Sequence, residues 1–111
     1  MLIKERIAND LSGNLFDVNC ATRRFFRCWL DGSYNGEEHY RRNVAFIQKN
    51  KDDKRRMRSF VISEFVLYTA CDSHCSPSYA AKMIREIVPA NDLERLNDEL
   101  IEDALDLVEG M

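Results

Sequence analysis

The chain has 111 residues, of which 45% are hydrophobic and 32% are charged, and its formal net charge is −3. This length suits one domain, which we place at residues 1–111, because a second domain would leave neither part a sufficient interior. Four glycines and two prolines are too few for the regular turns of an all-β domain, and no glycine-rich phosphate loop occurs. We therefore expect an all-α, compact single-domain bundle of five or six short helices.

Two helices are predicted in the first third of the chain. Apolar residues at helical spacing predict a helix over residues 2–11, which Gly13 and Asn14 would end. Asp17 is expected to cap a second helix. The apolar stripe of that helix comprises Val18, Ala21, Phe25, Cys28 and Trp29.

A third helix is predicted to begin at Glu37 and Glu38, because acidic side chains suit a helix N-terminus. The turn that precedes it, residues 33–36, contains an Asn-Gly pair. Asp52 or Asp53 is then expected to cap the next helix.

The stretch from residue 57 to residue 71 is open to two interpretations. Its high β propensity favours a strand, but a strand would lack partners in an otherwise helical chain. A 3.6-residue period runs through its apolar residues Met57, Phe60, Val61, Phe65 and Tyr68. We therefore predict that residues 57–71 form the buried central helix of the bundle.

The last two helices are predicted from their start signals. Ser76 and Pro77 form a cap followed by proline at the first helical position, and Pro89 ends that fifth helix. Asn91 and Glu94 predict a capping box for the last helix. Its apolar stripe comprises Leu93, Leu96, Leu100, Ala104 and Leu107.

The four cysteines are Cys20, Cys28, Cys71 and Cys75. We expect reduced thiols, because the charged residues 1–6 do not resemble an export signal. Cys71, His74 and Cys75 have residue types that bind zinc. They are weak candidates because no second ligand pair accompanies them: Cys20 and Cys28 lie about 12 Å apart along one helix at ~1.5 Å per residue and cannot share a zinc ion. We expect no metal and no cofactor.

Catalysis needs a nucleophile, a base and an orienting group brought together. The chain has two histidines, and only His74 adjoins a cysteine in the sequence. No glycine-built oxyanion loop accompanies them. We therefore predict no catalytic residues and expect a protein that is not an enzyme.

Positive charge is concentrated in the first half of the chain, where residues 1–58 carry a net charge of +5. The predicted basic face comprises Arg23, Arg24, Arg27, Arg41, Arg42, Lys54, Arg55, Arg56 and Arg58. Such clusters neutralise phosphates, so one hypothesis is a nucleic-acid-binding regulator that uses this face of residues 23–58 or a helix-turn-helix at 57–88. Against it stand the pI of about 5.4 and the long, glycine-free linker over residues 72–76.

Negative charge is concentrated in the last predicted helix, and residues 59–111 carry a net charge of −8. The predicted acidic face comprises Asp98, Glu99, Glu102, Asp103, Asp106 and Glu109. A rigid row of carboxylates can dock a basic patch on another protein. The alternative is that these charges only solvate an amphipathic helix or pair internally near Arg55 and Arg56.

The favoured interpretation is a small, non-enzymatic cytoplasmic protein that binds a larger protein partner and modulates it, most simply by inhibiting or neutralising it. Compact, charge-polarised single domains are typical of inhibitors and immunity-type proteins. The charge asymmetry also permits a homodimer. No apolar run reaches the roughly 18 residues of a membrane span, so no membrane partner is expected.

Overall fold

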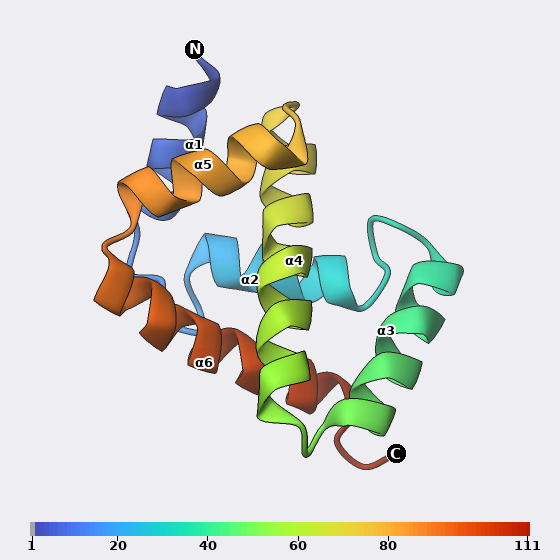
Figure 1. The fold of residues 1–111 in the computed structure, drawn as a ribbon. Helices are drawn as coiled ribbons and strands as arrows, with labels where there is room; N and C mark the ends of the chain where they lie inside the picture. Colours follow the sequence, from blue (N-terminus) through green and yellow to red (C-terminus); the bar gives the residue numbers. More distant parts are fainter. Residues whose placement is uncertain (1) are drawn as a thin grey trace.

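The computed structural model describes residues 2–111, which form six helices and no strands. The helices are α1 (Ile3–Leu11), α2 (Ala21–Leu30), α3 (Glu37–Asn50), α4 (Lys54–Ser73), α5 (Pro77–Ile87) and α6 (Ala90–Val108). Figure 1 shows α4 running through the middle, with α5 across one end of it and α2 and α6 crossing it lower down. The all-α bundle expected from the sequence is confirmed.

The central helix α4 is confirmed, and it extends beyond residues 57–71 at both ends. Met57, Val61 and Phe65 on its inner face are buried, and α5 and α6 pack most closely against it. Asp53 caps its start, where the carboxylate accepts a hydrogen bond from the backbone N–H of Arg56 at 3.1 Å. A cap of this kind satisfies a backbone N–H that has no partner within the helix, so α4 begins at Lys54.

The connection between α4 and α5 is short and tightly built. His74 adopts a left-handed conformation with φ of 56°, and the N–H of Cys75 donates to the carbonyl oxygen of Ala70 at 3.0 Å. These contacts satisfy the end of α4 in the way a left-handed cap does. The predicted start of α5 is confirmed, because the Ser76 hydroxyl accepts from the N–H of Tyr79 at 3.1 Å and Pro77 follows it.

Two predicted helix starts are wrong. Asp17 does not cap α2, because its carboxylate accepts from the N–H of Asn19 at 2.9 Å in a local turn, and α2 begins at Ala21. Asn91 does not begin the last helix either. The carbonyl oxygen of Pro89 already accepts from the N–H of Leu93 at 2.9 Å, so Pro89 itself caps α6.

The buried face of α2 also differs from the predicted stripe. Val18 and Phe25 were expected in the core, but they are 46% and 50% exposed. The buried face instead comprises Thr22, Arg23, Phe26, Trp29 and Leu30. Phe26 explains the rotation of the helix, because its ring packs edge-on against Phe65 of α4 with centroids 5.4 Å apart.

A buried ion pair joins α2 to α6. The Nε and Nη2 atoms of Arg23 donate to the two carboxylate oxygens of Asp103 at 2.7 and 2.9 Å. Nη1 donates to the carbonyl oxygen of Leu15 at 2.8 Å. Burial alone lowers the pKa of Arg23, but the hydrogen bonds to Asp103 and the attraction of Asp103 and Glu99 outweigh it and raise that pKa above its ordinary value.

Candidate functional site

The predicted acidic face is present on α6 without one of its members. Asp103 is 4% exposed and faces Arg23, so it is a structural residue and not part of a docking surface. The remaining carboxylates lie outside the core: Asp98, Glu102, Asp106 and Glu109 are exposed and Glu99 is partly buried. Leu96, Leu100 and Ala104 bury the opposite side of the helix, which fixes the orientation of this row. We call Asp98, Glu99, Glu102, Asp106 and Glu109 the acidic face from here on.

The predicted basic face does not form one free surface. Arg23 is 1% exposed, so it also leaves the set. The remaining members of the basic face come from three helices, and five of them pair with carboxylates. Those pairs are Arg27 with Asp103 at 3.7 Å, Arg41 with Glu37 at 2.8 Å, Lys54 and Arg58 with Asp98 at 4.0 and 3.8 Å, and Arg56 with Asp53 at 3.4 Å.

The acidic and basic surfaces meet at Asp98. Lys54 Nζ and Arg58 Nη1 both approach its Oδ1 atom from the start of α4. Internal pairing near Arg55 and Arg56 was one alternative for these charges, and it occurs for Asp98 through the flanking residues Lys54 and Arg58. Pairs this exposed contribute little to stability. The neighbouring carboxylates Glu102, Asp106 and Glu109 have no ion-pair partner among residues 2–111.

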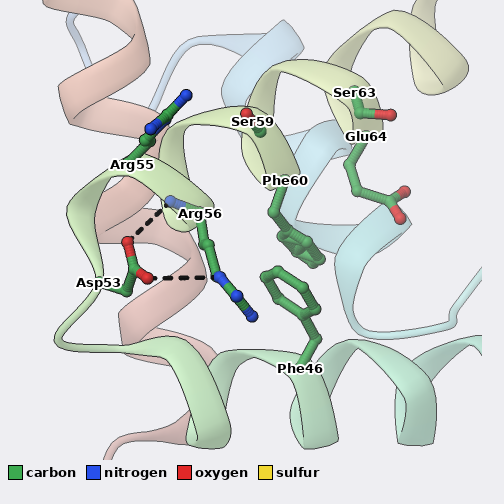
Figure 2. Close-up of a pocket in the computed structure, with 8 residues that line it drawn as sticks. All are labelled: Phe46, Asp53, Arg55, Arg56, Ser59, Phe60, Ser63 and Glu64. Atoms are coloured by element: carbon green, nitrogen blue, oxygen red, sulfur yellow. Dashed lines mark hydrogen bonds and ion pairs between the residues drawn. The ribbon is translucent and has the colours of Figure 1, made fainter.

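An open pocket of about 700 Å³ lies between α3 and α4. Figure 2 shows Phe46 and Phe60 stacked at its centre, and their ring centroids are 4.6 Å apart. Arg56 points into the pocket and is held by Asp53, while Glu64 lies at the other end. Phe60 was expected in the apolar stripe of the central helix, and the pocket itself was not predicted from the sequence.

Glu64 is tied to the interior and is not a free acid of that pocket. Its Oε2 atom accepts from the Trp29 indole N–H at 2.8 Å and lies 3.5 Å from His39 Nε2. The contact connects α4 to α2 and α3. His39, one of the two histidines considered for catalysis, therefore lies against a structural carboxylate. Our prediction of no catalytic residues stays a prediction.

The weak metal candidates do not form a ligand cluster. Cys71 and His74 are exposed and Cys75 is partly buried around the end of α4. Within residues 2–111 the structure brings no three histidine, cysteine or acidic side chains into metal-binding proximity. The four cysteines are free thiols.

A second, smaller cleft of about 340 Å³ lies between α2 and the end of α4. Its walls are Phe25, Trp29, Tyr34, Tyr68, Cys71 and Asp72. The grouping of these four aromatic rings was not predicted from the sequence.

Comparison of the chain with protein-family models, with curated proteins and with solved structures gives no match in any of the three. Within residues 2–111 every helix is too short or too polar to cross a membrane. A functional proposal for this all-α domain therefore rests on its own residues.

Proposed function

We propose that this protein is a small cytoplasmic, non-enzymatic binding protein that docks on a larger basic protein through the acidic face of α6 and thereby modulates it, as an inhibitor or immunity-type protein does. One observation carries the proposal. Glu102 and Asp106 of α6, and Glu109 at its C-cap, have no Lys, Arg or His nitrogen of residues 2–111 within 4.0 Å.

The rigidity of α6 makes this row suitable for recognition. Asp98 and Glu109 are eleven positions apart, which corresponds to about 16 Å at ~1.5 Å per residue. The buried pair of Arg23 and Asp103 holds the helix in place behind them. Fixed carboxylates attract a basic partner over roughly a Debye length and favour one docking orientation.

A pair of charge reversals tests the acidic face. The partner is first captured from native lysate with nuclease present, and its affinity is then measured by calorimetry. We expect Glu102→Lys with Asp106→Lys to weaken binding at least tenfold, with an unchanged circular dichroism spectrum. The matched control, Glu5→Lys with Glu38→Lys, makes the same charge change on α1 and α3 and should retain affinity within about twofold. Equal losses in both variants, or no loss in the first, would reject the assignment.

Nucleic-acid binding is the second candidate, and one observation favours it. Lys49, Lys51, Lys54, Arg55 and Arg56 are all exposed around the connection between α3 and α4. We expect any such binding to fade steeply as salt rises and to be lost in Lys51→Glu with Arg55→Glu. An electrophoretic shift assay with single-stranded DNA, duplex DNA and RNA measures this, and the absence of a shift at low salt would remove the candidate.

The helix-turn-helix form of that candidate has a shorter linker than expected. Only residues 74–76 separate α4 from α5. Ser78, Lys82 and Arg85 are exposed on α5, whereas Tyr79 is partly buried. The same shift assay with Lys82→Glu and Arg85→Glu separates this surface from the corner between α3 and α4.

A further inference from the structure

We propose that the cleft between α2 and the end of α4 is a binding site for an organic cation with an alkylammonium head group. Four aromatic side chains line it together with one carboxylate, that of Asp72. The six lining residues include no lysine or arginine. Aromatic faces attract cations through their quadrupole, so walls of this composition favour a positively charged ligand over an anionic one.

Two of the aromatic walls are left open to solvent. Phe25 and Tyr34 are 50% and 55% exposed, whereas Trp29 and Tyr68 are buried at the base. Exposed aromatic side chains gathered at a concave site are typical of ligand-binding grooves. The exposed pair therefore forms the rim of the site and the buried pair its floor.

The loop that carries Tyr34 is fixed by its backbone. Gly32 and Gly36 have φ of 82° and 94°, and the N–H of Gly36 donates to the carbonyl oxygen of Gly32 at 2.8 Å. A Cβ atom at residue 32 would lie 2.5 Å from the carbonyl oxygen of Gly36. Asp31 accepts a further bond from the N–H of Ser33 at 2.9 Å. Tyr34 is thus held beside the cleft before any ligand arrives, which lowers the entropic cost of binding.

The shape of the floor favours a rounded cation. The planes of Trp29 and Tyr68 meet at 66° with centroids 6.2 Å apart, so they form a corner and not a parallel slot. A planar guanidinium stacks best on a ring or between parallel rings, whereas a tetrahedral alkylammonium group can contact two inclined faces at once. Trp29 is fixed in this position by its bond to Glu64.

A second carboxyl group reinforces the charge of the site. The side chain of Asp10, from the end of α1, lies against that of Asp72, and burial together with this neighbour raises the pKa of Asp10 to about 6. Arg6 of α1 acts in the opposite direction, and the Tyr68 hydroxyl of α4 lies near both carboxyls. Thr22 of α2 holds the end of α1 in place, since its hydroxyl donates to the carbonyl oxygen of Asp10 at 2.6 Å.

The chain's only tryptophan lies in this cleft, so its fluorescence reports binding directly. Choline and its uncharged isostere 3,3-dimethylbutan-1-ol are titrated at pH 7.5 while Trp29 emission is recorded. We expect a saturable change with choline and binding roughly tenfold weaker for the uncharged alcohol. No saturable change, or equal affinity for the two compounds, overturns the proposal. Tighter binding of ethylguanidinium than of choline overturns the alkylammonium assignment.

Variants locate the choline site. Phe25→Ala and Tyr34→Ala should each weaken choline binding roughly two- to fivefold, and Asp72→Asn by about fivefold. Phe46→Ala removes a partly buried ring from the other pocket and serves as the matched control, with unchanged affinity. Wild-type affinity in all three cleft variants would overturn the assignment.

A pH series measured by calorimetry adds an independent arm. Choline binding should weaken between pH 7.5 and pH 5 as Asp10, whose pKa is raised to about 6, takes up a proton, and Asp10→Asn should flatten this dependence. No residue of α6 lines the cleft. Loss of choline binding and loss of the protein partner therefore test separate proposals.

Discussion

Helix α6 meets basic side chains in two places, and the two contacts differ in burial. Asp103 receives two hydrogen bonds from Arg23 in the interior, whereas Asp98 is approached by Lys54 and Arg58 at the surface, at 4.0 and 3.8 Å. Water solvates and screens the second contact. In the first, neither charge has water to replace its partner. Two carboxylates of the same helix therefore contribute differently to stability according to how deeply their ion pairs are buried. The sequence alone does not distinguish them.

The largest expected effect comes from breaking the buried contact. Arg23→Ala leaves Asp103 buried without the two hydrogen bonds from Arg23, and the partly exposed Arg27 at 3.7 Å is no substitute for them, so we expect the free energy of unfolding to fall by about 3–5 kcal/mol. Urea denaturation measures it. Arg24→Ala, on the exposed neighbour, should change it by less than ~0.5 kcal/mol. Arg23→Met with Asp103→Leu should recover most of the loss, since it removes both charges. Similar losses in the first two variants would contradict the comparison.

The N-cap residue of α4, Asp53, adds a third kind of contact to this comparison. Its exposed carboxylate accepts a hydrogen bond from a backbone N–H. Asp53→Ala should lower the free energy of unfolding by ~1 kcal/mol through loss of the bond to the N–H of Arg56. Asp53→Ser, which can still cap, should retain most of the stability. Denaturation curves of the three proteins decide this, and equal losses in the two variants would show that the ion pair with Arg56 matters more than the cap.

The carboxyl groups of Asp10 and Asp72 bring two like charges together, so loss of the proton on Asp10 should destabilise the folded protein. The pKa of Asp10 is raised to about 6 in the folded protein, so the folded state holds a proton that the unfolded chain releases near pH 4. The stabilisation is complete below about pH 4 and is lost as the pH rises through about 6. Thermal unfolding from pH 4.5 to 7.5 measures this contribution as the difference between the wild type and Asp10→Asn, which lacks the titrating group. Parallel profiles in the two proteins would contradict it.

The smallest expected effect is at the surface contact. Asp98→Asn should change the free energy of unfolding by ~0.5 kcal/mol or less, and the change should shrink further at high salt. Denaturation at two salt concentrations tests this. A salt-independent loss above ~2 kcal/mol would place Asp98 in the same class as Asp103.

Local signals in the sequence predict much of this fold. The caps at Asp53 and Ser76, the proline at the first position of α5 and the break at Pro89 act on adjacent backbone, so they can be identified without knowledge of tertiary contacts. The face of α2 cannot be identified in that way. An arginine in an amphipathic pattern reads as a surface residue, and the carboxylate that allows Arg23 to be buried lies 80 positions further along the chain.

The candidate sites were harder to predict for the same reason. The residues of the aromatic cleft run from Phe25 to Asp72 and come from two helices and a loop, so no local spacing relates them. The acidic face was predicted because its members recur on one helix. Its one error, Asp103, is the member that a distant residue draws into the core.

The long separation within the buried pair has a consequence for synthesis of the chain. Helices α1 to α5 leave the ribosome before Asp103 does, and until then Arg23 has no carboxylate to accompany it into the interior. Domains emerge N-terminus first at about 5–20 residues per second, so Asp103 emerges several seconds after Arg23. The last helix thus completes the interior, and a nascent chain halted before α6 would keep the arginine face of α2 hydrated and its core unformed.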